Sequence, residues 1–452
     1  MKKEKEHTVF HHALKIVPEL CIGCTHCMKA CPTQAIRVRD GLAEIFEERC
    51  VDCGECYKAC PVSAIIVEQD DFNEIFRYKA RVVLLPSVLI GQFPSQITTE
   101  EIFGSLKKLG FTHIFEIDSV VEQVQEGYDR FRKDYSGQDP LISTFCPAIV
   151  RLIQVRFPSM VNNLVRVKPP SDIAALHFKS VLMNEGFAEE EVGLFYVTPC
   201  AAKIASVKSP VGEESSAVNG VINMEYLYNR MLQLIMNREV EKDEGETGSL
   251  TSKGILWSLT RGESKHQPGR CLAVDGISNV TQFLERLEDT EESNINFLEL
   301  RACDESCAGG VLISGNRFLT VERLNGRAKK LPETYQDSAD SNMGKYDPDA
   351  YGLRTIPARS MMVLDSDRNA ALDKMKKIDD LLKVLPGIDC AACGSPTCRS
   401  LAEDIVQERA EITSCVFMQE LYLRKGKITL DEVDRINEGI WGKGRDQRSQ
   451  GK

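Results

Sequence analysis

Eight cysteines near the beginning of the chain form two runs with the same spacing, Cys-x2-Cys-x2-Cys-x3-Cys-Pro. Soft thiolates at these intervals suit a pair of 4Fe-4S cubanes, in which each run supplies three ligands to one cluster and the fourth to the other. We therefore expect Cys60 to complete the first cluster and Cys31 the second. Zinc is the alternative, but zinc motifs rarely repeat a four-cysteine run that ends in Cys-Pro. The expected ligands are Cys21, Cys24, Cys27, Cys31, Cys50, Cys53, Cys56 and Cys60.

Another cysteine group lies near the end of the chain, at Cys390, Cys393, Cys398 and Cys415. Four thiolates in a loop and a following helix could hold zinc or a third 4Fe-4S cluster, because both accept a set of four sulfur ligands. The iron-sulfur runs elsewhere in the chain favour the cluster.

The long middle of the chain carries five further cysteines, four of which lie in three separated segments. The segments are STFCPA at 143–148, TPCAAK at 198–203 and ELRACDESCAGG at 299–310. Gly309 and Gly310 follow the last cysteine, where the lack of side chains would let the backbone come close to a bulky cluster. The four cysteines are Cys146, Cys200, Cys303 and Cys307.

Together with the upstream runs, these segments resemble the signature of the FeFe-hydrogenase family over about residues 15–420. The resemblance implies that the four cysteines hold a cubane and that Cys307 also bridges to a diiron unit with carbon monoxide, cyanide and a bridging dithiolate, the H-cluster. It further implies that Lys203 pairs with one iron-bound cyanide, and that the segment of Pro86 and Ser87 binds the other through the serine. The alternative for Lys203 is an ordinary surface lysine.

Three positions depart from the family's pattern beside the diiron unit. Phe145 stands where the family has a cysteine that passes protons, and a phenyl ring cannot carry a proton. Thr198 and Arg301 stand where the family has methionines, so we expect a more polar pocket with an extra cation.

The family's proton path also lacks clear counterparts. The best local matches to its groups are Gln123, Glu126 and Ser206, of which only Glu126 could relay a proton. These changes resemble a sensory group of the family, so we expect slow turnover through another route. Further candidates for that route are Glu122, Glu299 and Cys271. A simpler role for Cys271 is that of a small apolar residue on a buried strand.

Other functions compete with that of a hydrogenase that interconverts H2 with protons and electrons. A signalling protein could carry the same cofactor and report its redox state to a separate partner. A non-catalytic iron-sulfur protein, similar to the prelamin-recognition and cytosolic iron-sulfur assembly relatives, would keep the cubane without the diiron unit; Lys203 and Cys307 argue against this. A plain electron carrier would leave the long middle of the chain without a purpose.

The elements that position these residues point to an α/β fold. Apolar runs at 81–90, 192–197 and 295–300 predict buried strands, and the helical stretches between them favour parallel pairing. The family resemblance implies a two-lobed catalytic domain with four-stranded, mostly parallel sheets and the H-cluster between the lobes. Two helices have recognisable caps: Asn223 precedes one, and Thr429 with Glu432 has capping-box spacing.

We divide the chain into four parts. Residues 1–76 are expected to form a bacterial-ferredoxin-like α+β domain with two 4Fe-4S clusters, and residues 77–364 the catalytic domain. A small 4Fe-4S module at 365–425 begins with an amphipathic helix, and a short helix with a disordered tail follows at 426–452.

Composition limits the compartment and the partners. The 17 cysteines occur without a signal-like or membrane-spanning apolar stretch, so we expect metal ligands in an anaerobic cytoplasm rather than disulfides. A net charge of -11 argues against nucleic acid or an anionic membrane as a partner. The expected partners are H2, protons, and ferredoxin or another redox or signalling protein.

Overall fold

The computed structural model describes residues 10–243, 250–289, 294–333 and 348–443. They belong to two compact units, one made of Met1–Ala13 and Glu68–Ala358 and the other of Leu14–Val67 and Arg359–Lys452. The tail at 444–452, which the sequence predicts to be disordered, lies outside the described residues.

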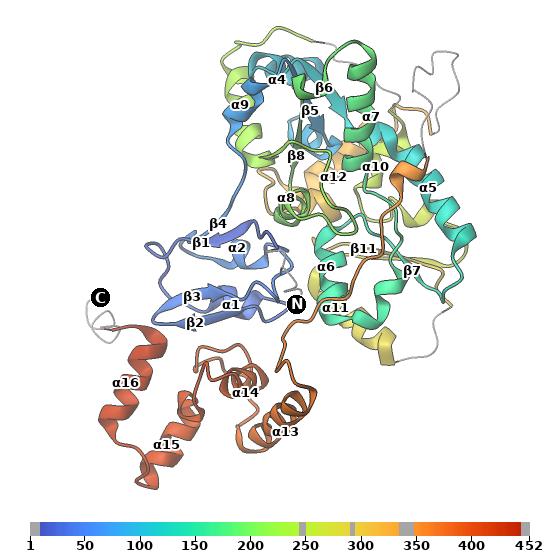
Figure 1. The fold of residues 1–452 in the computed structure, drawn as a ribbon. Coiled ribbons are helices and arrows are strands. Elements are labelled where there is room, and N and C mark those ends of the chain that lie inside the picture. Colours follow the sequence, from blue (N-terminus) through green and yellow to red (C-terminus); the bar gives the residue numbers. More distant parts are fainter. Residues whose placement is uncertain (1–9, 244–249, 290–293, 334–347, 444–452) are drawn as a thin grey trace, which may run out of the picture. The chain divides into compact units, whose positions relative to one another are not determined.

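Four parallel strands form the larger sheet of the first unit, in the order β6-β5-β8-β9 (Figure 1). Every residue of β8 is buried, as expected for a parallel strand covered on both faces. In register, Val82 of β5 lies opposite His113 on one side and Leu194 on the other. The strands are β5 (Ala80–Leu85), β6 (His113–Glu116), β8 (Val192–Thr198) and β9 (Gly220–Asn223).

A smaller parallel sheet has the order β10-β11-β7, with β7 at Leu141–Ile142, β10 at Cys271–Val274 and β11 at Phe297–Leu300. The α/β class with parallel sheets is therefore confirmed. The expectation that both sheets have four strands is wrong for the described residues, since this sheet has three. β10 is also less buried than predicted, with Leu272 exposed.

Helices cover both faces of the larger sheet (Figure 1). Because side chains alternate along a strand, Val83 and Phe195 join α4 and α9 in one apolar core, while α7 packs on β5 and β8 from the other face. The Asn223 side chain accepts from two backbone N–H groups of α9, which confirms the predicted cap. The helices of this unit are α3 (Ser87–Gln92), α4 (Thr99–Lys108), α5 (Val121–Asp134), α6 (Pro147–Arg156), α7 (Pro170–Asn184), α8 (Ala201–Lys208), α9 (Met224–Met236), α10 (Ser252–Trp257), α11 (Ile277–Asp289) and α12 (Arg317–Ala328).

Short 3-10 helices complete both units, and several carry residues of the site. They are η1 (Phe72–Arg77), η2 (Ile117–Val120), η3 (Pro158–Asn163), η4 (Glu189–Glu191), η5 (Ser264–His266), η6 (Ser306–Gly309), η7 (Pro348–Tyr351) and η8 (Ile412–Ser414).

The second unit begins with an internally repeated α+β fold. Its strands pair antiparallel, β1 with β4 and β2 with β3, and the two short helices α1 and α2 pack together. The C-terminal part packs on it: the Val38 N–H donates to the Gly394 carbonyl at 2.9 Å, and Arg37 pairs with Asp404 at 2.6 Å. The elements are β1 (Leu14–Ile16), α1 (His26–Ala30), β2 (Ile36–Arg39), β3 (Leu42–Ile45), α2 (Glu55–Ala59), β4 (Ile65–Val67), α13 (Arg368–Val384), α14 (Cys398–Val406), α15 (Val416–Arg424) and α16 (Leu430–Trp441).

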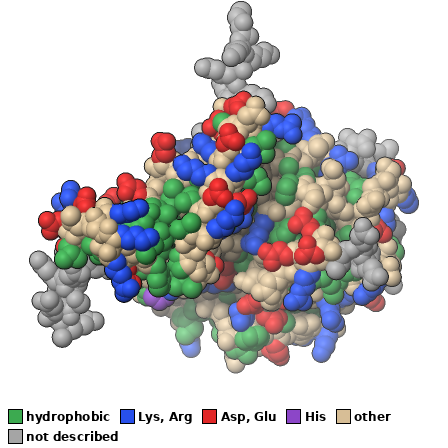
Figure 2. All heavy atoms as spheres, turned by 90° about the horizontal axis from the view of Figure 1, so that it is seen from below, with side chains coloured by type: hydrophobic (Ala, Val, Ile, Leu, Met, Phe, Trp, Pro, Cys, Tyr) green, Lys and Arg blue, Asp and Glu red, His purple; other side chains and the backbone are tan. Residues whose placement is uncertain are grey.

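Two further sequence predictions concern this unit. The capping box of Thr429 and Glu432 is present at the start of α16. The amphipathic helix at 365–386 is α13, which buries Ile378 but leaves Leu372 and Met375 exposed. Among the described residues no helix combines the length and the apolar character needed to cross a bilayer. Figure 2 shows acidic and basic side chains interspersed on the face that it draws.

Candidate active site

The four cysteines of the middle segments all follow parallel strands of the first unit. Cys146 follows β7 and caps α6, Cys200 follows β8 and caps α8, and Cys303 and Cys307 follow β11. Carboxyl ends of parallel strands are where α/β folds build binding sites, and a helix N-terminus favours an anionic ligand such as a thiolate. The strand order therefore places the cysteine segments where a buried anionic group can be held.

Electrostatic interactions connect the thiols of Cys146, Cys200 and Cys307. The pKa of Cys200 is raised to about 12, mainly by burial; the nearby Cys146 and Cys307 also raise it, whereas Lys203 lowers it. Burial also raises the pKa of Cys146, while the backbone N–H groups of Ala302 and Ile149 oppose this rise. Cys303 is buried and lies four residues before Cys307, and none of the four cysteines forms a disulfide. Buried thiols of this kind ionise readily only when a metal binds them, so the set fits a metal cluster.

Gly309 and Gly310 are required by close packing of the chain on itself. A Cβ atom on Gly309 would lie 1.8 Å from the Asp304 carbonyl oxygen, and one on Gly310 would lie 2.5 Å from that of Pro199. The Leu312 N–H donates to the same Pro199 carbonyl at 3.0 Å. Gly309 thus allows the third cysteine segment to fold tightly on itself, and Gly310 lets it pack against the second segment, reasons that differ from the predicted approach to a cluster.

Lys203 is a buried cation rather than a surface lysine. Its Nζ lies 4.4 Å from the centroid of the Phe145 ring and donates to the Tyr196 hydroxyl at 3.2 Å. Burial lowers the pKa of Lys203, but Tyr196, Cys307 and Cys200 outweigh burial and hold the pKa above its ordinary value. Lys203 therefore stays charged beside the thiols.

Arg301 is a second buried cation and directly follows β11 of the smaller sheet. Its Cζ lies 3.9 Å from the Phe145 ring centroid, and its Nη2 lies 3.2 Å from Glu263 and from the Trp257 carbonyl. Burial lowers the pKa of Arg301, but Glu263 and Glu299 outweigh burial and raise it. Among the described residues its Nε and Nη1 have no hydrogen-bond partner. The Nε lies 3.7 Å from Glu299, so Nη1 is the donor that fits a bound anion.

Two buried carboxylates, Glu263 and Glu299, balance the charge of Arg301, and their hydrogen-bond partners differ. Glu299 accepts from the backbone N–H groups of Arg261, Glu263 and Ser264, so it ties a loop to β11. Burial raises the pKa of Glu263, against the charge of Arg301. Tyr128 donates to Glu263 at 3.0 Å. Sequence alone did not indicate Glu263 or Tyr128, because neither lies near a cysteine segment.

Pro86 and Ser87 end β5 and begin α3, on the same edge of the sheet as the segment of Cys200. Ser87 is buried and its N–H donates to Asp118 at 2.6 Å. Burial raises the pKa of Asp118 to about 6, and hydrogen bonds from Ser87 and the charge of Lys203 oppose this rise. Asp118 lies just after the carboxyl end of β6, where α/β folds place binding residues, so its position in the sequence could have indicated it.

The expected proton relays lie in different places. Glu126 is exposed on α5, and Glu122 of the same helix pairs with Lys253 at 2.9 Å. Ser206 donates to the Lys203 carbonyl at 2.9 Å and lines a cavity beside Phe145. Gln123 lies on α5, Thr198 is buried at the end of β8, and Cys271 is half-buried on β10 with its thiol donating to the Gln267 carbonyl at 3.4 Å.

The thiols of the second unit fall into three groups. The pKa of Cys27 is raised to about 12 by burial and by Cys24, Cys21 and Cys60. Burial, together with Cys31, raises the pKa of Cys53 and of Cys56; Cys50 is a neighbour of both Cys31 and Cys56. Burial raises the pKa of Cys393 to about 11, with Cys415 and Cys390 as neighbours. Cys398 begins α14, and its N–H donates to Asp389.

Fold and site together define an iron-sulfur redox protein. A family model described as "Iron only hydrogenase large subunit, C-terminal domain" matches residues 82–254. A 4Fe-4S dicluster model matches residues 13–61, and an Fe-S cluster model matches residues 385–417. Over these residues the chain is similar to iron-only, or FeFe, hydrogenases.

The relatives found are distant. The NADP-reducing hydrogenase subunit HndD of Solidesulfovibrio fructosivorans is 28% identical over 203 residues, which are 42% of this chain and 31% of that protein. Iron hydrogenase 1 of Clostridium pasteurianum is 23% identical over 239 residues, 50% of this chain and 39% of that protein. The matches thus span less than half of either relative. A solved FeFe-hydrogenase from Chlamydomonas reinhardtii is 14% identical, covers 64% of this chain and 98% of its own, and has a TM-score of 0.48.

Proposed function

We propose that the chain is a slow FeFe-hydrogenase that interconverts H2 with protons and electrons and serves hydrogen sensing or redox signalling. The observation that carries the proposal is the set of half-buried thiols at Cys146, Cys200 and Cys307 beside the buried ammonium of Lys203. An iron-sulfur protein that only carried electrons would not need a buried cation there. An H-cluster, when bound, supplies the iron centres at which the H–H bond is split.

The residues of the chain would act on that group in distinct ways. Cys146, Cys200, Cys303 and Cys307 would hold the cubane, and Cys307 would also bridge to the diiron unit. Lys203 would donate to one cyanide from its buried position, and Ser87 to the other. The free Nη1 of Arg301 offers a further donor to the anionic group.

Electrons would enter and leave through three accessory 4Fe-4S clusters in the second unit. The two ferredoxin-like sites and the C-terminal site are held by the cysteine groups described above. Ferredoxin or another redox or signalling protein of the cytoplasm would be the electron partner. Slow turnover follows from Phe145, because its ring replaces the proton-passing thiol of the family.

Infrared spectroscopy tests this proposal. The purified chain, reconstituted with iron and sulfide and then loaded with a synthetic diiron cofactor, should show bands of iron-bound carbon monoxide and cyanide. Cys307→Ser should lose these bands, whereas Cys271→Ser, which changes a cysteine outside the proposed ligand sets, should keep them. Bands in the wild type with slow H2-dependent reduction of a viologen dye support the proposal. Iron-sulfur clusters without such bands would favour the non-catalytic alternative.

A further inference from the structure

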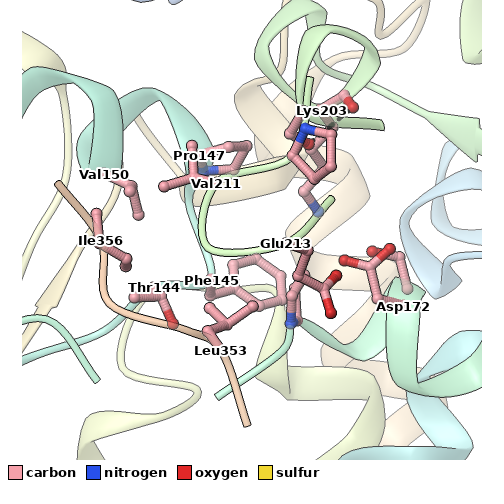
Figure 3. Close-up of a pocket in the computed structure, with 14 residues that line it drawn as sticks. Thr144, Phe145, Pro147, Val150, Asp172, Lys203, Val211, Glu213, Leu353 and Ile356 are labelled. Atoms are coloured by element: carbon pink, nitrogen blue, oxygen red, sulfur yellow. Dashed lines mark hydrogen bonds between the residues drawn. The ribbon is translucent and has the colours of Figure 1, made fainter. Parts of the chain in front are cut away.

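A cavity of about 60 Å³ in the first unit lies against Phe145 and Lys203 (Figure 3). Ser171 and Asp172 from the start of α7 and Ser206 from α8 contribute polar groups to its wall. This volume is enough to hold water, provided that polar partners are present, and the cavity has them. The Phe145 ring, which cannot pass a proton, thus borders a space that can hold water.

Asp172 is one of the two acidic residues that line this cavity, and it lies beside Ser171 at the start of α7. The Ser216 hydroxyl donates to its carboxylate at 3.3 Å. Burial raises the pKa of Asp172 to about 6, and Lys168, the Ser216 hydrogen bond and Lys203 oppose this rise. A carboxyl with a pKa near the operating pH can both accept and release a proton, which a carboxylate with an ordinary pKa does poorly.

Charged groups surround Asp172 on several elements. Lys168, just before α7, forms an ion pair with Glu213, and both side chains are 14% exposed. Glu213 also lines the cavity, so the cavity wall includes a side chain that contacts solvent. On η2, which packs against α7, Asp118 is a further buried carboxyl within electrostatic range of Lys203. In Figure 3 the side chains of Lys203, Glu213 and Asp172 point toward one another.

We propose that Asp172 is the proton relay of this protein, taking the place of the thiol that Phe145 removes. The inference rests on the proposed hydrogenase function. During H2 oxidation a proton leaving the diiron site would pass to water in the cavity; an O–H bond of the hydronium breaks and an O–H bond forms on the Asp172 carboxylate. Asp172 then returns the proton to water on the side of Glu213. No electrons move in this step, since they leave separately through the accessory clusters.

The first test needs no diiron cofactor. The sample is the protein that carries only its 4Fe-4S clusters, and its infrared spectra are recorded across the acidic pH range in H2O and D2O. The spectra should contain a carboxyl C=O band that titrates near pH 6. This band should be missing from Asp172→Asn. Asp118→Asn identifies the separate band of the other buried carboxyl. Asp134→Asn, an exposed change on α5, should leave both bands in place.

The second test uses the cofactor-loaded protein. Asp172→Asn should lower H2 oxidation about 100-fold and remove its dependence on a group titrating near pH 6, whereas Asp172→Glu should recover much of the rate. If Asp172→Asn keeps the carbon monoxide and cyanide bands and also has the turnover and pH profile of the wild type, the relay proposal is overturned and the hydrogenase proposal stands. Absence of those bands from the wild type would remove the hydrogenase proposal and the relay with it.

Discussion

The Arg301 guanidinium lies 3.9 Å from the centroid of the Phe145 ring, and both side chains are buried. The Lys203 ammonium lies 4.4 Å from the same centroid. One aromatic ring thus contacts two buried cations, an arrangement that stabilises each cation through the negative face of the ring. The position that loses a proton carrier therefore gains a role in holding positive charge beside the cysteines.

Replacing Arg301 with methionine should strongly destabilise the first unit. The change leaves Glu263 and Glu299 buried without their cation, and breaking a buried ion pair in this way costs about 3–5 kcal/mol. Denaturant titration of the metal-free protein would measure the loss. Arg354→Met, which removes an exposed ion pair, is the matched control and should leave the midpoint unchanged. The double change with Glu263→Gln should be milder than Arg301→Met alone; a wild-type midpoint for Arg301→Met would contradict the argument.

Replacing Phe145 with cysteine should speed turnover of the loaded protein. A thiol at this position can carry a proton, and proton transfer by a positioned group contributes about 100-fold or more. Phe145→Ala is the control, because it removes the same ring without adding a proton carrier. The comparison is the rate of viologen reduction under H2 at equal intensity of the cofactor bands. Equal rates in the two variants would show that proton delivery does not limit this protein.

Local sequence patterns predicted much of the scaffold. The apolar runs gave β5, β8 and β11, and the capping signals of Asn223 and Thr429 gave the starts of α9 and α16. These features depend on residues only a few positions apart. Exposure depends on what packs above an element, so Leu272 on β10 could not be judged from its own segment.

The cysteine ligands could also be predicted from the sequence, because the spacing of ligands is a local pattern. The residues that surround these cysteines in the fold could not be predicted in this way. Tyr196, Glu263 and Asp118 meet the site from separate elements, and only the strand order brings them there. Glu299 illustrates the same limit: its charge suggested a proton carrier, but three backbone N–H groups from the loop at 261–264 bind its carboxylate. Such partners cannot be read from the sequence around Glu299.

Asp118 should make stability depend on pH in the acidic range. Burial raises its pKa in the folded protein from 3.8 to about 6, so the folded state binds the proton more tightly than the unfolded state does. Stability should therefore fall as pH rises through this window, by about 3 kcal/mol for a shift of about two units, and stay flat above it. Denaturant midpoints of wild type and Asp118→Asn, compared across the window, measure this. Asp134→Asn should parallel the wild type; a parallel profile for Asp118→Asn would refute the assignment.

Asp404 should be essential for the C-terminal cluster group of the second unit. Its Oδ2 accepts from Arg37 at 2.6 Å, from Arg39 at 3.0 Å and from the Ser395 hydroxyl at 2.7 Å, and Ser395 lies between Cys393 and Cys398. Asp404→Ala leaves the fully buried Arg37 without its anion, which costs about 3–5 kcal/mol. The cysteine loop should then lose its anchor, and reconstituted protein should hold about one cluster fewer by iron and sulfide analysis. Asp380→Asn, at an exposed ion pair on α13, should keep the full iron content; full content in Asp404→Ala would show that the loop is anchored by other contacts.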